Sequence, residues 1–378
     1  MPGAPRRVLS VPASTSTVSV SAINTTATIH SCPADLFFGP PIPGHKWLAA
    51  PIWSFLICHP TLNKTLLFDL GIRKDWGNLA PGLISHILEL GWKLHVDKDV
   101  HDILAGNGVD TSSIDGIILS HHHFDHIGDP STFPTTVPLI VGPGFTTAVI
   151  PGYPSDPSSV IRESDYAGRQ TRELDFGEGS CKIGSFDALD YFGDGSLYLL
   201  NAPGHTVGHI CAFARVTSNS FVLLAGDAIH HVGELRPSPY LQLPEKISPS
   251  PFSIPAASSS KTVCPGSLRF SCLLPNGPTA SFYMPCTGHG SNWHHDVGEL
   301  RETVRKLQEL DCSDQILVCA SHDESLHDIV EFFPAGTLDH FVEQGWKEKV
   351  TWRFLRDFGE AVNMECEGPD KFPNDAWA

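Results

Sequence analysis

Residues 120–129 read Ser-His-His-His-Phe-Asp-His-Ile-Gly-Asp, and this stretch says more about the fold than any other. Three imidazoles and one carboxylate follow the pattern His-x-His-x-Asp-His, at His121, His123, Asp125 and His126. Neutral imidazole nitrogens and carboxylate oxygens are the usual ligands of zinc and similar divalent ions at sites that activate water. His122 falls between these positions and receives no metal role. The pattern therefore favours a metal-binding loop over a solvated, histidine-rich surface loop.

Further ligand-type residues follow other apolar runs. The run 114–119 leads into the histidine stretch, 197–200 leads to His205, 221–225 leads to Asp227, and 316–319 leads to His322. Short apolar, β-branched runs bounded by turn residues indicate buried strands. Side chains on loops at successive strand ends can converge on one rim of a β-sandwich. A lone histidine after a strand is more often a surface residue, so it is the recurrence that favours a metal site.

The rest of the chain predicts an α/β protein. Further strands are expected over 18–29, 51–59, 65–70 and 137–141, and helices over 83–90 and 297–310. Residues 1–17 are rich in Ser and Thr and are expected to form a flexible arm before one domain over 18–378. Within that domain, the Pro/Ser-rich segment 236–289 is expected to be an insertion or a lid.

Composition limits the classes of partner. The formal charge of −17 argues against nucleic-acid binding and against docking on anionic membranes, because both need a basic surface. The sequence contains no apolar stretch of about 18 residues, so it predicts no membrane span. No Cys-x-x-Cys pair occurs, and scattered cysteines favour a reducing compartment and a cytoplasmic location. Cys264, Cys272 and Cys286 share a loop region in which a disulfide is possible but not required.

In their order along the chain, these motifs resemble the metallo-β-lactamase superfamily over about residues 18–358. The resemblance implies an αββα sandwich with a metal site along one edge of the two sheets. It implies two Zn²⁺ ions per chain, with other divalent ions possible. The first would be bound by His121, His123 and His205, the second by Asp125, His126 and His322, and Asp227 would bridge both. Asp69 matches an aspartate that the family carries near the site. It is expected either to orient the imidazole of a metal ligand or to have a buried structural role, with equal weight.

Within the superfamily, the chain looks most like the N-acyl homoserine lactonases and their fungal relatives. The supporting stretches are 225–231, 235–238, 345–347 and 352–354. Those lactonases carry a tyrosine three residues after the bridging aspartate, where this chain has His230. An imidazole could donate a hydrogen bond to the same substrate oxygen, or it could simply pack. Homoserine-lactone specificity is therefore not carried over.

The function implied is a metal-dependent hydrolase that opens a small lactone or lactam, of the secondary-metabolite or defence-compound type. Metal-activated water would be the nucleophile, and Asp125 would pass a proton to the leaving atom. A thioesterase acting on an acyl thioester is the main alternative; a nuclease, a one-iron oxygenase and a metal-binding protein without turnover fit less well. The expected partner is a small molecule, and the oligomeric state is left open. Candidate pocket walls, each also a candidate for the core, are Trp53, Phe145, Phe282 and Trp293.

Overall fold

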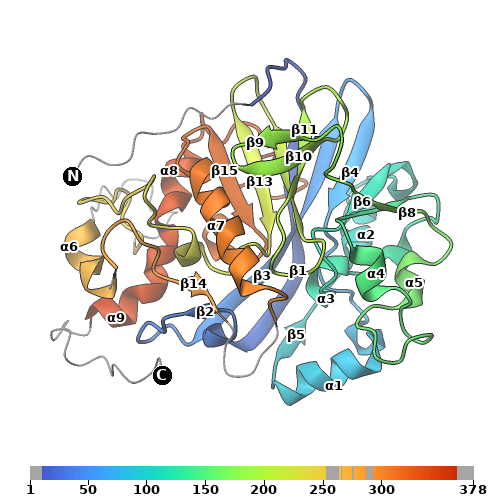
Figure 1. Ribbon diagram of the computed structural model, residues 1–378, viewed down its shortest axis with the longest axis horizontal. Helices are drawn as coiled ribbons and strands as arrows, with labels where there is room; N and C mark the ends of the chain where they lie inside the picture. Colours follow the sequence, from blue (N-terminus) through green and yellow to red (C-terminus); the bar gives the residue numbers. More distant parts are fainter. Residues whose placement is uncertain (1–10, 253–263, 265, 275, 287–292, 364–378) are drawn as a thin grey trace.

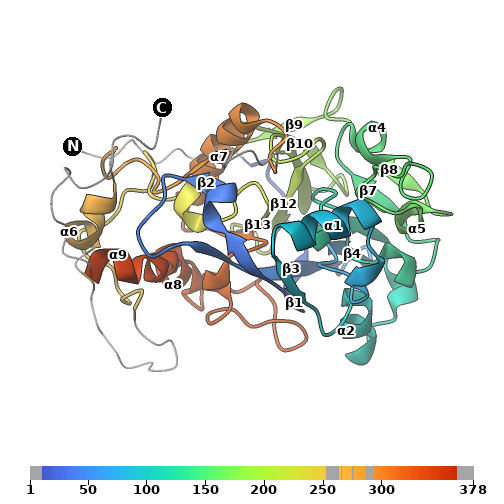
Figure 2. The ribbon, with the colours of Figure 1, turned by 90° about the horizontal axis from the view of Figure 1, so that it is seen from below.

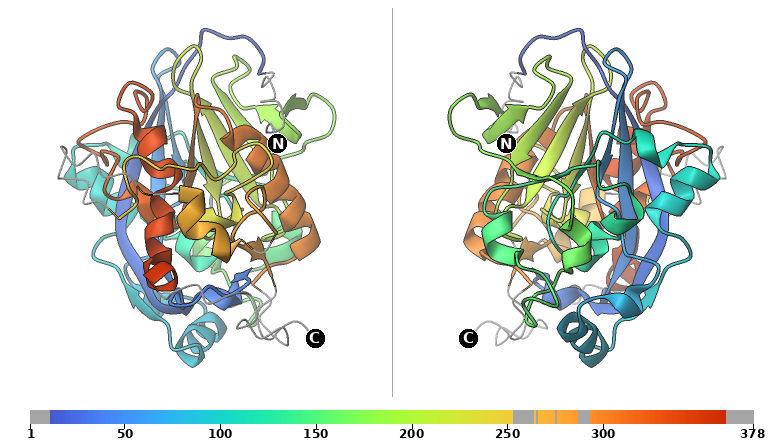
Figure 3. Two further views of the ribbon diagram at one scale, coloured as in Figure 1. Left: turned by 90° about the vertical axis from the view of Figure 1, so that its left-hand side faces the viewer. Right: turned by 90° about the vertical axis from the view of Figure 1, so that its right-hand side faces the viewer.

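Two β-sheets packed face to face form the centre of the computed structural model, which describes residues 11–252, 264, 266–274, 276–286 and 293–363 (Figures 1 and 3). The first sheet has the strand order β5-β1-β3-β4-β6-β7-β8. Its strands are β1 Ser19–Pro33, β3 Trp47–His59, β4 Lys64–Phe68, β5 Lys93–His95, β6 Gly116–Ile118, β7 Leu139–Val141 and β8 Thr171–Glu173. The second has the order β15-β13-β12-β11-β10-β9. Its strands are β9 Cys181–Ile183, β10 Phe186–Asp190, β11 Leu197–Asn201, β12 Ile210–Arg215, β13 Phe221–Gly226 and β15 Ile316–Ala320.

The space between the sheets is filled by apolar side chains from both. Phe55 and Phe68 of the first sheet pack in one cluster with Leu199 and Leu224 of the second. Strands β6 and β7 are buried along their whole length, because helices cover the face that the other sheet does not. This is why they read in the sequence as continuous apolar runs and not as alternating ones.

Helices form the two outer layers. On the second sheet, α7 (Val297–Asp311) packs Val304, Leu307 and Leu310 against the outer face. On the first sheet, α2 (Val100–Gly106) contributes to the outer cluster, together with α4 (Phe145–Val149). The remaining helices are α1 Pro81–Glu89, α3 Phe124–Ile127, α5 Glu163–Tyr166, α6 Gly266–Phe270, α8 Trp346–Thr351 and α9 Gly359–Asn363. The predicted αββα sandwich is confirmed.

The direction of the strands determines at which end of the sandwich the predicted site residues lie. Strands β4 and β6 are parallel neighbours, as are β13 and β15, so the loops that follow each pair leave at the same edge. Strand β11 is two antiparallel steps from β13 and therefore runs in the same direction as β13. All five of these strands lead to one end of the sandwich, where β2 (Phe38–Gly39) and α1 lie (Figure 2).

The strands that carry motifs lie where the sequence predicted them, to within a few residues. Strand β12 was not predicted. Of the arm over residues 1–17, the part from 11 onward is described, and there Arg215 Nη2 donates to the carbonyl of Pro12 at 2.6 Å. The division into an arm and one domain stays a prediction. None of the described helices combines the length and the apolar character needed to span a membrane.

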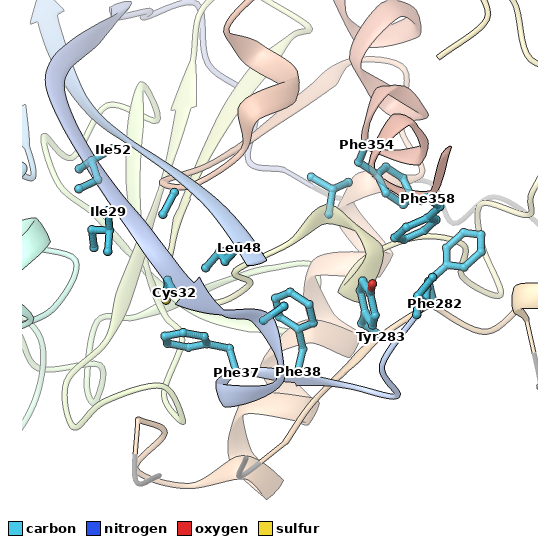
Figure 4. Close-up of a cluster of buried hydrophobic side chains, with 14 of the residues drawn as sticks. Ile29, Cys32, Phe37, Phe38, Leu48, Ile52, Phe282, Tyr283, Phe354 and Phe358 are labelled. Carbon is cyan, nitrogen blue, oxygen red and sulfur yellow. The ribbon is translucent and has the colours of Figure 1, made fainter. Parts of the chain in front are cut away.

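The described parts of the segment 236–289 pack against the sandwich. Strand β14 (Met284–Pro285) pairs with β2, and Phe282 and Tyr283 are buried against Phe358 (Figure 4). Ser258, Ser259 and Ser260 lie outside the described residues. Cys264 and Cys286 are free thiols, so neither is joined to Cys272, which is itself disulfide-bonded. Whether the segment acts as a lid stays a prediction.

A buried ion cluster joins this segment to two helices. Arg236 donates from Nε and Nη2 to the carboxylate of Asp311 at 2.7 and 2.6 Å, at the end of α7. Lys347 of α8 donates to the same carboxylate at 2.7 Å. All three side chains are buried. Removing one partner of such a cluster leaves the others charged and without compensation.

We therefore expect Asp311→Ala to lower the free energy of unfolding by about 3–5 kcal/mol, because Arg236 and Lys347 lose their buried counter-charge. Urea unfolding measures the change. Glu302→Ala removes an exposed partner of Arg305 on the same helix and serves as the control, with little effect expected. Equal small effects of the two substitutions would contradict a stabilising role of the cluster.

Candidate metal centre

The seven predicted ligand residues meet at one end of the sandwich. His121 and His123 lie on the loop after β6, and α3 follows directly with Asp125 and His126. His205, Asp227 and His322 lie just after β11, β13 and β15. Two sheets thus supply one site, and Asp125 and His322, 197 positions apart in sequence, come within contact distance. The structure separates them into two groups, His121–His123–His205 and Asp125–His126–Asp227–His322.

The first group is three imidazoles with their nitrogens pointing at one another. Nε2 of His205 lies 3.1 Å from Nε2 of His121 and 2.9 Å from Nδ1 of His123. A tetrahedral ion with metal–nitrogen bonds of about 2.0 Å holds its ligand nitrogens about 3.3 Å apart. The observed spacing is therefore close to that of three ligands around one small cation.

The second group combines two carboxylates with two imidazoles. Nε2 of His126 lies 3.1 Å from Oδ1 of Asp227, and Nε2 of His322 lies 3.2 Å from Oδ2. His322 Nε2 is also 3.5 Å from Oδ2 of Asp125. Asp227 faces the first group as well, with Oδ2 3.7 Å from Nε2 of His205. Its position between the two groups is the position a bridging carboxylate needs.

Three outer contacts orient the imidazoles of the second group and their surroundings. Asp69 Oδ2 lies 2.8 Å from Nδ1 of His126 and also accepts from the Ser120 hydroxyl at 2.7 Å. Nδ1 of His322 lies 3.0 Å from the carbonyl of Pro51 and donates to it. With the proton held on Nδ1, each ring presents the lone pair of Nε2 to the centre. Asp69 therefore contacts a predicted ligand directly.

His209 is a residue that the motif reading missed. Its Nδ1 donates to the carbonyl of Ala202 at 3.0 Å, and its Nε2 accepts from the backbone N–H of Asp227 at 3.1 Å. A Cβ at Gly226 would lie 2.8 Å from that Nε2, so this close approach requires glycine. The only signal in the sequence was its place four residues after His205. His209 fixes the backbone that carries Asp227.

Electrostatics keep most of the imidazoles neutral and Asp227 charged. Burial, followed by the neighbouring imidazoles, holds the pKa of His121 and of His205 well below the usual range. Burial works to raise the pKa of Asp227, but the charges of His126 and His322 outweigh it and hold that pKa well below its usual value. Burial works to lower the pKa of His126 and of His322, but the charge of Asp227 outweighs it and raises both. Imidazoles bind a cation in their neutral form, so these two rings give up a proton when a cation binds.

Two atoms at the centre lack hydrogen-bond partners. Among the described residues, neither Nε2 of His126 nor Oδ1 of Asp227 has a hydrogen-bond partner of acceptable geometry, although both atoms are buried and lie 3.1 Å apart. Buried polar atoms without partners are rare and call for a ligand or an ion. The donor set and these two atoms fit a pair of divalent cations.

His230 lies at the edge of the centre, in the loop between β13 and the short 3-10 helix η5 (Val232–Glu234). Its Nε2 is 3.3 Å from Oδ2 of Asp227, and its ring stacks on Phe37 at a centroid distance of 4.5 Å. The side chain is buried, and neither ring nitrogen has a hydrogen-bond partner. It thus packs through one face, with Nε2 beside the Asp227 carboxylate and with Nδ1 lacking a hydrogen-bond partner among the described residues.

An apolar cavity adjoins the carboxylates and His230. Its wall is formed mainly by Ile29, Cys32, Phe37, Leu48, Ala50, Trp92, Phe124 and Trp293, four of which are seen in Figure 4. Trp293 stacks on Trp92 at 4.8 Å and meets His123 edge-on at 5.9 Å. Of the four candidate pocket walls, Trp293 lines this cavity, whereas Trp53, Phe145 and Phe282 are buried in the core clusters.

Comparison with known proteins agrees with this geometry. A sequence family described as the metallo-beta-lactamase superfamily matches residues 48–322. The chain therefore belongs to the metallo-β-lactamase superfamily, and the predicted class of enzyme, a metal-dependent hydrolase, is confirmed.

Two fungal proteins are similar over most of their length. The chain is 43% identical over 355 residues to gamma-lactamase FDB1 of Fusarium pseudograminearum, which covers 92% of this chain and 84% of that protein. It is 42% identical over 368 residues to metallo-hydrolase mfmC of Annulohypoxylon moriforme, which covers 95% and 92%. Among solved structures, a mutant of B. thuringiensis AiiA with N-decanoyl-L-homoserine at its active site aligns with a TM-score of 0.55 and 17% identity. That alignment covers 85% of this chain and 99% of AiiA, and it shows the shared fold.

A buried carboxyl beneath the site gives a test of its electrostatics. This carboxyl belongs to Glu234, the last residue of η5 (Val232–Glu234). Its Oε2 caps the start of η5 by accepting from the backbone N–H groups of His230 and His231 at 2.7 and 3.0 Å. Burial raises the pKa of Glu234 from 4.5 to about 8. The folded state therefore holds the proton more tightly than the unfolded state, and stability falls as the pH rises from 4.5 through about 8.

We expect Glu234→Gln to keep the two accepted hydrogen bonds and to remove the cost of ionisation. The melting temperature of the variant should match that of the wild type near the lower end of this range and exceed it increasingly toward the upper end. Thermal unfolding across the pH range measures this, with the exposed Glu348→Gln as a control expected to follow the wild type. A constant difference between Glu234→Gln and wild type at all pH values would contradict the raised pKa.

Proposed function

We propose that this chain is a dinuclear-metal hydrolase that opens a small lactam or lactone ring with two Zn²⁺ ions. The observation that carries the proposal is the convergence of seven donor side chains in two groups, with Asp227 of the second group facing the first. One ion would be held by His121, His123 and His205, the other by Asp125, His126 and His322, with Asp227 between them. Histidine-rich sites with few carboxylates favour zinc over magnesium or calcium.

The substrate class follows from the cavity wall and from the relatives. Apolar and aromatic side chains form most of the wall, and the polar side chains of His123, Asp125, Asp227, His230 and His322 line the rest, which supports an uncharged substrate held beside the metals. The relative that is 43% identical over most of this chain is named a gamma-lactamase, which supports a cyclic amide as substrate. The proposed cytoplasmic location rests on the partly exposed free thiols of Cys58, Cys181 and Cys286, and the disulfide at Cys272 stands against it.

Two divalent ions bound here would lower the pKa of a water from ~15.7 toward ~7 and polarise the scissile carbonyl. The chain's own residues do the rest. Asp125 lies at the cavity and can pass a proton to the nitrogen or oxygen that leaves as the ring opens. His230 can donate a hydrogen bond to the oxygen on which negative charge develops, while the aromatic wall excludes bulk water.

Metal content and hydrolysis, measured on the same purified protein, test the proposal. We expect about two zinc ions per chain and turnover of γ-lactams or lactones, with loss of activity on chelation and recovery on adding zinc. A parallel screen with thioesters distinguishes the proposed function from the main alternative, a thioesterase. One metal per chain without hydrolysis, or turnover of thioesters alone, would contradict the proposed function.

Asp125→Asn is the matched variant for this experiment, because it keeps the shape of the side chain and removes its charge. We expect hydrolysis to fall by at least ~10²-fold while the circular dichroism spectrum is unchanged. An Asp125→Asn variant with wild-type activity would exclude the two-metal mechanism.

His230 has a separate test. His230→Phe keeps a ring stacked on Phe37 but removes both nitrogens, so we expect kcat to fall by ~10²- to 10³-fold with the metal content unchanged. His230→Gln restores an N–H donor and should recover part of that loss. If His230→Phe hydrolysed the substrate as fast as the wild type, the imidazole would only be a packing group.

A further inference from the structure

The segment that leads into α7 is held tightly against the loop that carries His205. The backbone N–H of His295 donates to the carbonyl of His205 at 2.9 Å, and that of Asp296 donates to the carbonyl of Gly204 at 2.9 Å. A Cβ at Gly204 would lie 2.1 Å from the backbone nitrogen of Leu300, so the approach of α7 requires glycine there. The residues before α7 therefore have a fixed position relative to His205.

His294, in this segment, faces the side of the His205 ring that points away from the metal centre. Nδ1 of His294 lies 3.1 Å from Nδ1 of His205, and Nε2 of His294 lies 2.9 Å from the carbonyl oxygen of Phe37. A carbonyl only accepts, so Nε2 of His294 must carry the proton and donate it. In a neutral imidazole the other nitrogen then has a lone pair. Nδ1 of His294 therefore accepts, and Nδ1 of His205 donates.

The surroundings of His294 keep this arrangement in place. The ring is 5% exposed, and its two nitrogens face the His205 ring and the carbonyl of Phe37, so a positive charge on it would be buried without a carboxylate partner and the neutral form is favoured. The carbonyl of Phe37 also accepts from the backbone N–H of Cys286 at 3.0 Å, which fixes the acceptor itself. Backbone hydrogen bonds therefore hold both residues that His294 joins: one from Cys286 holds Phe37, and one from His295 holds His205.

We propose that His294 is a positioning residue that sets the tautomer of His205. With its proton held on Nδ1 by His294, His205 presents the lone pair of Nε2 to His121 and His123, where the first metal is proposed to bind. The inference rests on the proposed function, since it requires His205 to be a metal ligand. His294 does for the first group what Asp69 does for His126, with a neutral acceptor in place of a carboxylate.

Two substitutions of the same shape separate the hydrogen bond from packing. His294→Asn places Oδ1 near the position of Nδ1 and can accept from His205, whereas His294→Leu has the same branching and accepts nothing. Both lose the bond to the carbonyl of Phe37, so that loss cancels in the comparison. Zinc affinity of the two sites is measured by titration of metal-free protein against a chelator, beside the melting temperature of the metal-free protein.

We expect His294→Leu to weaken one of the two sites by about 10- to 100-fold and to leave the other unchanged. The zinc affinity of His294→Asn should stay within a few-fold of the wild type at both sites. The two metal-free variants should have the same melting temperature. Equal weakening in both variants, or none in His294→Leu, would overturn the inference. A third zinc equivalent lost in both variants would also overturn it, because His205, His230 and His294 would then form a site of their own.

The wild type provides a second readout that needs no stable variant. In ¹⁵N-labelled, zinc-loaded protein, NMR of the ring nitrogens should find the proton of His205 on Nδ1 and that of His294 on Nε2. The opposite tautomer in either ring would overturn the inference. Failure of the wild-type chain to bind two metals is a different result, which would instead remove the proposed function on which the inference rests.

Discussion

The carboxylate of Asp227 is a buried charge around which the site end of the molecule is organised. Five imidazoles lie within 4.0 Å of it, those of His121, His126, His205, His230 and His322. Burying an uncompensated charge costs several kcal/mol, so this position is tolerable only if other groups or bound cations balance it. The outer contacts, from Asp69, His209 and the carbonyl of Pro51, hold those groups and the backbone of Asp227 in place.

Much of this site could be predicted from the sequence because its donors are tied to strand ends. The loop 121–126 carries four of them in a fixed local pattern, and parallel strands bring the others to the same edge. His294 could not be predicted in this way. It lies 89 residues from His205 and is joined to it only by folding, through backbone hydrogen bonds that no local pattern records. His209 and β12 were missed for a similar reason, since neither stands beside a motif.

Rigid and variable parts of the site have different origins. The donors come from strand ends of two sheets whose shared core is fully apolar, which fixes their spacing. The cavity wall combines strands β1 and β3 and helix α3 with three loop segments, which lie after β1, after α1 and before α7. Loops between strands tolerate change better than the strands do. One sandwich can therefore keep a constant metal centre beneath a wall that differs among relatives.

Phe37 combines the two parts within one residue. Its ring belongs to the cavity wall and stacks on His230, whereas its carbonyl holds His294. Every amino acid carries the same carbonyl, so mutation at this position alters the surface that meets the substrate without removing the acceptor. Substitutions at residue 37 can therefore change which substrates fit the cavity, while the backbone carbonyl that holds His294, and through it His205, stays in place.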